Sequence, residues 1–88
     1  MEKLMNKNNN YNVDAIEKAI ELLGGAEKLA RKLEVSYTTV FKWRKGQSVP
    51  SLLKCIDIEI VTENQVKREE ILPNFPWEKL EKKDKNND

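Results

Sequence analysis

The chain lacks histidine altogether and contains a single cysteine, Cys55, among its 88 residues. Without histidine there is no imidazole general acid or base, and a structural zinc site would lack the several Cys or His ligands that it needs. One cysteine cannot form an internal disulfide, which fits a reducing compartment. We therefore expect no metal, no cofactor and no catalytic site, and we interpret Cys55 as a small buried apolar residue.

Long apolar runs are also missing. No stretch approaches the roughly twenty apolar residues of a membrane-spanning helix, and the opening segment MEKLMNKNNNYN has no apolar run typical of a secretion signal. With 39% hydrophobic and 35% charged residues and a formal net charge of +1, the chain suits one small core and leaves no room for a second. We expect a helical domain in the cytoplasm with no membrane partner.

The nearly balanced charge is unevenly distributed. Residues 26–50 carry six cations and only two acids, whereas residues 51–80 carry four cations and six acids. A local excess of positive charge is typical of proteins that bind a polyanion. It is equally compatible with a lysine-rich helix face that simply contacts solvent.

Capping residues and helix breakers predict a series of short helices. Asn12 is a suitable N-cap for a first helix, and the glycine pair at 24–25 ends it. A second short helix follows in AEKLARKLE. Ser36 is a strong N-cap for a third helix, which Gly46 ends. Apolar residues at helical spacing define the expected core faces of these helices: Ile16, Ala19, Ile20, Leu23, Leu29, Ala30, Leu33, Val40 and Trp43.

The second half of the chain allows alternatives. Pro50 suits the first turn of a fourth helix, PSLLKCIDIEIVTE, on which Leu53, Ile56 and Ile60 share a face. The alternation in CIDIEIV, residues 55–61, fits a strand as well. A last helical turn is expected in KREEIL. Five further apolar residues either complete the core or form a contact between two copies of the chain: Ile58, Ile71, Leu72, Phe75 and Trp77.

The helix predicted at 36–45 has two unlike faces. At 100° per residue, Val40 and Trp43 fall on one side, and we assign them to the core. The other side carries two aromatic rings, a threonine and two lysines: Tyr37, Thr38, Phe41, Lys42 and Lys45. Such a face suits the DNA major groove, where lysine and hydroxyl groups contact base edges or phosphates and an aromatic edge contacts thymine methyls. Phe41 has an alternative place under one of the terminal arms.

From about Val13 to Trp77 the chain resembles the small Cro-like and YdaS-type helix-turn-helix regulators of phages and mobile elements. The resemblance is carried by AIELLGGAEKLARKLEVSYTTVFKWRKGQSVP and, more weakly, by KREEILP.FPW. In this family a small residue, here Ala30, lies where two helices cross, and apolar residues bracket it. All five bracketing positions match: Leu29, Leu33, Val35, Val40 and Trp43.

The resemblance implies a fold and a division of the chain. The fold would be all-α, a small four- to five-helix bundle of the lambda-repressor-like or Cro-like type, with its helix-turn-helix domain at residues 12–77. We expect residues 1–11 to form a disordered N-terminal arm and residues 78–88 a disordered charged tail. Glu34 stands at a turn where glycine is usual, so strain of order 1–2 kcal/mol is expected there. Lys67 stands where Ser or Thr commonly caps the last turn.

It also implies roles for individual residues on double-stranded DNA. Base contacts are expected from the start and exposed side of the third helix: Ser36, Tyr37, Thr38, Phe41 and Lys42. Phosphate contacts, which set register without selecting sequence, are expected from Lys28, Arg44, Lys45 and Gln47. Operators of such proteins are usually palindromic, with half-sites one helical turn or roughly 34 Å apart, so we expect a homodimer at least on DNA.

Three functions remain open from sequence alone. The first is a sequence-specific transcriptional repressor. The second is an antitoxin-type interaction module, in which the acidic half of the chain or the tail binds a toxin or other protein partner and DNA binding is secondary. The third is a purely structural helical domain, which the exposed aromatic residues disfavour. An enzyme is not expected, since no nucleophile has a visible base and the adjacent Glu69 and Glu70 would point apart on a helix.

Overall fold

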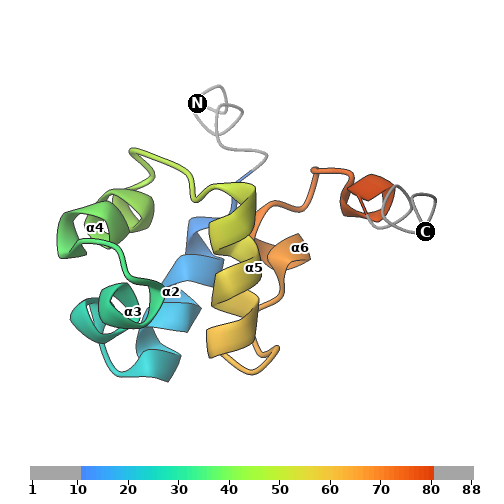
Figure 1. Cartoon of the computed structure of the whole chain (residues 1–88). Coiled ribbons are helices and arrows are strands. Elements are labelled where there is room, and N and C mark those ends of the chain that lie inside the picture. Colours follow the sequence, from blue (N-terminus) through green and yellow to red (C-terminus); the bar gives the residue numbers. More distant parts are fainter. Residues whose placement is uncertain (1–10, 81–88) are drawn as a thin grey trace.

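The computed structural model of the protein describes residues 11–80, and its regular elements there are helices (Figure 1). The elements run in the order α2 (Val13–Leu23), α3 (Ala26–Leu33), α4 (Tyr37–Lys45), α5 (Leu52–Val61) and α6 (Arg68–Ile71), and a further helical turn follows at 77–80. This confirms the predicted all-α bundle. Residues 55–61 lie within α5, so the strand alternative is wrong.

Most helix boundaries follow from the capping residues. The side chain of Asn12 accepts a hydrogen bond from the backbone N–H of Asp14 at the start of α2, and that of Ser36 accepts one from Thr39 at the start of α4. Gly24 ends α2 at φ 92° and Gly46 ends α4 at φ 76°, both in the left-handed region that glycine adopts without strain. These four predicted boundaries are confirmed.

The start of α5 differs from the prediction. Ser51 is the N-cap, and its hydroxyl accepts a hydrogen bond of 3.2 Å from the backbone N–H of Lys54. Pro50 therefore precedes the cap, and its expected place in the first turn is wrong. Lys67 caps α6 without a side-chain bond. The backbone N–H of Arg68 donates instead to a Glu59 carboxylate oxygen 2.8 Å away.

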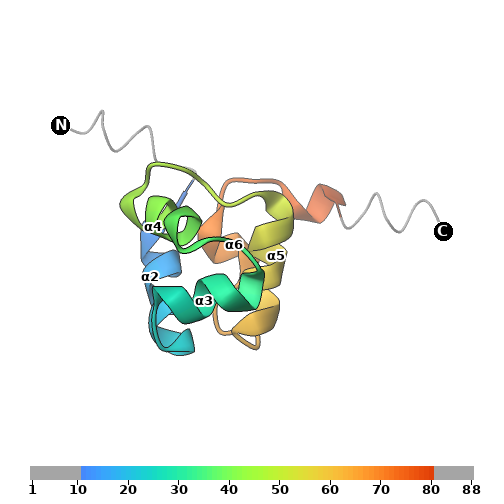
Figure 2. The same ribbon diagram turned by 60° about the vertical axis from the view of Figure 1, so that its left-hand side comes forward.

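The core lies where α2, α3 and α4 pack on one another, and α5 and α6 close it from the other side (Figure 2). Ile16, Leu29 and Val40 are completely buried at its centre. All the apolar positions predicted to face inward on the first three helices are buried, except Leu23, which is partly buried against the core. Ala30 lies with 3% of its surface exposed, as expected of a small residue where two helices cross.

Five apolar residues of the second half of the chain, for which the sequence allowed either a place in the core or a contact between copies, lie in or against this core. Ile58 and Ile71 are fully buried, Leu72 and Trp77 are buried, and Phe75 is partly buried with its ring centroid 4.7 Å from that of Trp77. The indole N–H of Trp77 donates to the carbonyl oxygen of Leu72 at 3.0 Å. Of the two alternatives, the structure shows completion of the core for the four buried residues.

Parts of the two predicted arms fall within the described residues. Tyr11, which the prediction placed in the N-terminal arm, is only 5% exposed, and its hydroxyl donates to the carbonyl oxygen of Trp43 at 2.8 Å. Residues 78–80 belong to the last helical turn. The rest of the two predicted arms, residues 1–10 and 81–88, lies outside the described residues.

Candidate nucleic-acid interface

Two helices joined by a tight turn form the candidate site. The turn depends on Glu34, which caps α3 at φ 60° and ψ 42° and donates its N–H toward the carbonyls of Ala30 and Arg31. The next residue, Val35, donates its N–H to the Ala30 carbonyl at 3.0 Å. A non-glycine residue in this region is strained, as the sequence indicated. The turn places α4 across α3 (Figure 2).

Three anchors hold α4 in place. Val40 is 0% exposed and Trp43 is 4% exposed, so the inner face of the helix is fixed in the core. At the C-terminal end, the Tyr11 hydroxyl satisfies the Trp43 carbonyl, one of those that a helix end leaves without a partner. Burial raises the pKa of this hydroxyl, with a smaller effect of Cys55, so it remains a hydrogen-bond donor. The outer face of α4 is therefore presented on a rigid element.

An exposed row of side chains runs along that outer face. The rings of Tyr37 and Phe41 have centroids 6.2 Å apart, and Lys45 Nζ lies 5.5 Å from the Phe41 centroid. Tyr37 is 52% exposed and Phe41 37% exposed. The three residues are four positions apart, so they stack along one side of the helix. Phe41 is thus not buried under another described segment.

Thr38 and Lys42 lie beside this row and are exposed. They extend the face with a hydroxyl and an ammonium group, both of which can bond to base edges. Ser36 caps α4: its Oγ accepts a hydrogen bond from the Thr39 N–H at 3.1 Å and lies 3.0 Å from the Thr39 hydroxyl. The structure therefore brings the predicted base-contacting side chains to one end and one face of α4.

The predicted phosphate-contacting residues differ from one another in the contacts that their side chains make. Arg44 is already paired: its guanidinium donates two hydrogen bonds to the Glu17 carboxylate, at 2.9 and 3.0 Å. The ammonium group of Lys45 lies over a ring, whereas Lys28 and Gln47 have exposed side chains. The pair uses two of the five N–H donors of the guanidinium, so a two-point phosphate contact through the same edge of Arg44 would replace its bond to α2.

Sequence reasoning missed three residues that support the site. Tyr11 lies in a polar, asparagine-rich stretch without periodicity, and Glu17 is one of several acids on the solvent side of α2. Lys54 donates to the Leu33 carbonyl at the end of α3, with a distance of 2.8 Å, and also pairs with Asp57 at 3.5 Å. For the pair of Glu17 and Arg44, the sequence offered only two opposite charges on two predicted helices. That was not enough to predict that these two residues meet.

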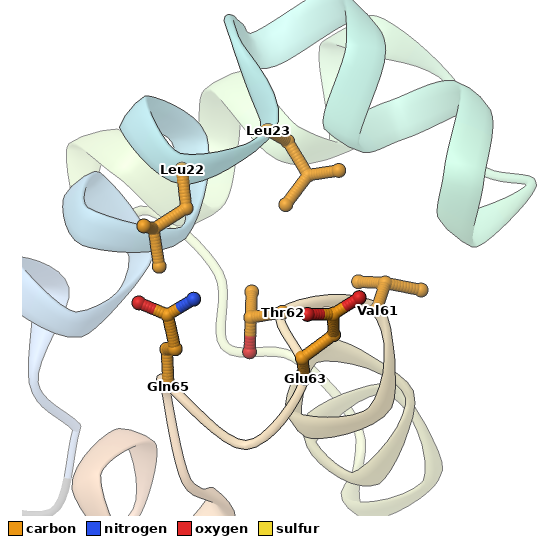
Figure 3. A pocket seen from close by; sticks show the side chains of 6 residues that line it. All are labelled: Leu22, Leu23, Val61, Thr62, Glu63 and Gln65. Carbon is orange, nitrogen blue, oxygen red and sulfur yellow. The ribbon is translucent and has the colours of Figure 1, made fainter.

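The hollows on the described part of the molecule are small. One of about 310 Å³ lies beside the site and is lined by Glu17, Phe41, Arg44 and Lys45. Another, of about 210 Å³, lies between the end of α2 and the loop after α5, where Figure 3 shows Leu22 and Leu23 facing Thr62 and Gln65. Small-molecule sites are usually 300–1,000 Å³, so both hollows lie at or below the lower end of that range. Along residues 11–80 no helix is long and apolar enough to cross a membrane, and no His, Cys, Asp and Glu side chains gather there as a metal site would require.

Comparisons with known proteins identify a family and two relatives. Residues 16–80 match the protein family described as "Bacterial toxin YdaS". The "Regulatory protein cro" of Pseudomonas phage D3 is 33% identical over 57 residues, covering 65% of this chain and 78% of that protein. The "Putative transcriptional regulator YdaS" of Escherichia coli (strain K12) is 34% identical over 74 residues, covering 84% of this chain and 72% of that protein. No solved structure matches the chain significantly.

Proposed function

This chain belongs to the YdaS family, and on that premise we propose that it is a sequence-specific regulator of transcription that binds double-stranded DNA as a Cro-like repressor. The observation that carries the proposal is the exposed row Tyr37, Phe41 and Lys45 on a helix whose other side is fixed in the core. The major groove is wide enough to admit one such helix. The names of the two relatives, a regulatory protein and a transcriptional regulator, support the same conclusion.

In the proposed complex α4 lies in the major groove and contacts base edges. Phe41 and Tyr37 contact thymine methyl groups, while Lys42 donates to guanine acceptors and Thr38 bonds to either partner of a base pair. Ser36 caps the helix and contacts the DNA at its entry into the groove. The backbone contacts, which hold α4 in register, come from Lys28, Arg44, Lys45 and Gln47.

One such helix covers only a few base pairs, so the proposed operator is a palindrome bound by two copies. Its half-sites lie one helical turn apart, roughly 34 Å. Repression then follows from occupancy, because a dimer on a promoter excludes other proteins from the same groove.

The test begins with selection of bound duplexes from random DNA, followed by affinity measurements on the selected site for Phe41→Ala and Lys42→Ala. Loss of one base contact costs about 1–3 kcal/mol, so each change should weaken binding by roughly 5- to 150-fold and relax the sequence preference. Lys32→Ala is the matched control, since it removes an exposed cation from the neighbouring helix α3. We expect it to change affinity no more than about threefold.

Thermal unfolding by circular dichroism checks that each variant keeps its fold. Unchanged sequence preference in both α4 variants would show that this face does not contact bases. A salt-dependent affinity without any selected sequence would retain a basic DNA-binding surface but contradict the proposed operator.

The description of the family as a toxin favours a second candidate, a module that acts through a protein partner, with DNA binding secondary. Expression of the wild type and of Lys42→Ala in bacteria separates the two. Growth inhibition that persists when DNA binding is lost supports the partner module, whereas joint loss of both effects supports action through DNA.

A further inference from the structure

Lys54 occupies an unusual place for a cation. It is the third residue of α5, in the first turn, where the partial positive charge of a helix N-terminus disfavours a positive side chain. Its ammonium group bonds instead to the opposite kind of helix end, because it donates to the Leu33 carbonyl oxygen at 2.8 Å. Leu33 is the last residue of α3, and a helix C-terminus carries partial negative charge. Lys54 therefore acts on α3 rather than on its own helix.

The carboxylate of Asp57 helps to hold Lys54 in this orientation. It lies 3.5 Å from Lys54 Nζ, three residues further along α5. A lysine side chain has many rotamers, so fixing it costs conformational entropy, which a second partner offsets in part. The Lys54 side chain is only 30% exposed, which reduces the competition from water and salt for its two partners.

The bonded carbonyl stands directly before the turn that leads to α4. Glu34 follows Leu33 and adopts φ 60°, a conformation that costs energy for a residue with a side chain. The N-cap of α4, Ser36, comes two residues later. Because the Leu33 carbonyl and the Glu34 nitrogen share one peptide plane, fixing the carbonyl also restricts the dihedral angles of the turn.

The helix α5 reaches α4 through α3. It packs on α3 and α6, whereas α4 packs on α2 and α3. In Figure 2, α3 runs toward α5, and the chain returns from there to α4. A bond between α5 and the last carbonyl of α3 therefore lies where it can influence the orientation of α4 without touching its outer face.

We propose that Lys54 is a positioning residue for DNA recognition: by fixing the Leu33 carbonyl, it sets the angle at which α4 leaves the turn and enters the major groove. Lys54 itself does not contact DNA. The inference rests on the proposed function, since it concerns the same face of α4. Loss of the bond leaves a folded protein in which α4 samples more orientations. Base contacts need a closely defined geometry, so they are weakened more than phosphate contacts.

The experiment measures the affinity of Lys54→Met for the selected operator and for a random duplex. Methionine keeps a side chain of similar length but removes the charge and the donor. Affinity for the operator should fall about 5- to 20-fold, whereas affinity for the random duplex should change no more than about threefold. The slope of log affinity against log salt should not change, because no phosphate contact is lost. Lys67→Met is the matched control: it removes an exposed lysine before α6 and should change neither affinity more than about threefold.

Two further variants separate positioning from charge and from stability. Lys54→Arg keeps the charge and the donors, and it should restore operator affinity to within about threefold of the wild type. Asp57→Asn removes an acid, so an effect of charge alone would strengthen binding. Loss of its hold on Lys54 predicts the opposite, operator binding about 2- to 5-fold weaker. All affinities are measured where urea unfolding shows each variant to be at least about 99% folded, so that reduced stability cannot lower them.

Unchanged operator affinity in Lys54→Met, or tighter binding by Asp57→Asn, overturns the proposal. A loss of affinity with a salt slope reduced by about one overturns it as well, since Lys54 would then contact a phosphate directly. If Lys54→Met does not fold, the sign of the Asp57→Asn effect decides. Phe41→Ala is measured on the same duplexes. If only Phe41→Ala weakens operator binding, the positioning role fails and the proposed function stands, whereas a lack of effect in both variants contradicts the proposed function.

Discussion

At the scale of single residues, the bond between Arg44 and Glu17 is the feature of the site with the clearest consequence. The two side chains form a doubly hydrogen-bonded pair across α4 and α2, and both are partly exposed. Exposed pairs of this kind contribute only about 0–1 kcal/mol to stability. A phosphate offers the same edge of Arg44 an equivalent two-point contact, so in the free protein the bond to Glu17 competes with a phosphate contact there.

We therefore expect Glu17→Gln to strengthen binding to DNA. The change frees Arg44 and removes a negative charge beside the proposed phosphate contacts, so affinity should rise about 3- to 10-fold at low salt. The slope of log affinity against log salt should steepen by about one, because one more counterion is released. Glu21→Gln, on the same helix, is the control and should have a smaller effect. Weaker binding of Glu17→Gln would show instead that the pair holds Arg44 in its productive orientation.

At the scale of elements, the turn between α3 and α4 combines a required backbone shape with an unfavourable residue. Glu34 adopts φ 60° to reverse the chain after α3. Glycine adopts this conformation freely, whereas other residues carry a cost. The shape is maintained by the packing of Ala30, Leu33 and Val40 on both sides of the turn.

Glu34→Gly should therefore stabilise the protein by about 0.5–1 kcal/mol. For a domain of this size the midpoint of thermal unfolding should rise by several degrees. Glu21→Gly is the opposite control, since Glu21 lies within α2 and glycine in a helix interior costs about 1 kcal/mol. If Glu34→Gly destabilises the protein as much as Glu21→Gly, the turn is not strained by its side chain.

The elements also show how far sequence reasoning extends. Helix ends were predictable because capping is local: Ser36 and Gly46 act within three or four residues of their own position. The orientation of α5 was not predictable, because LLKCIDIEIV carries apolar side chains all round and so lacks a polar side that would indicate solvent. Which side faces the core is decided by contacts with two other helices, α3 and α6, which the pattern within this segment does not contain.

At the scale of the whole molecule, the exposed face of α4 could be predicted from a local pattern, whereas the residues that hold α4 in place could not. The exposed row from Tyr37 to Lys45 was predictable because its aromatic and cationic residues recur at helical spacing on one helix. Its anchors at Tyr11 and Glu17 were not, since each depends on a partner about thirty residues away, at Trp43 and Arg44. Local patterns thus indicated the candidate function, while long-range pairs determine how rigidly it is presented.

The closing of α5 over the core gives the whole molecule a pH dependence. Burial of the Cys55 thiol raises its pKa from an ordinary 9.0 to about 12. Above pH 9 the unfolded chain loses this proton while the folded chain keeps it, so the free energy of unfolding must fall as pH rises. The slope for one such group is about 1.4 kcal/mol per pH unit, and it ends near the folded-state pKa.

Cys55→Ala isolates this effect from the lysines and tyrosines that titrate in the same range. At pH 8 the variant should be less stable than the wild type by about 1–2 kcal/mol, because it leaves a small cavity. The gap should close by about 1.4 kcal/mol per pH unit above pH 9, since only the wild type has a thiol that ionises on unfolding. Urea unfolding at pH 8 and pH 10 measures both values. A gap that stays constant between them would mean that the thiol ionises equally well in the folded protein, and α5 would then be packed too loosely to exclude water from the core.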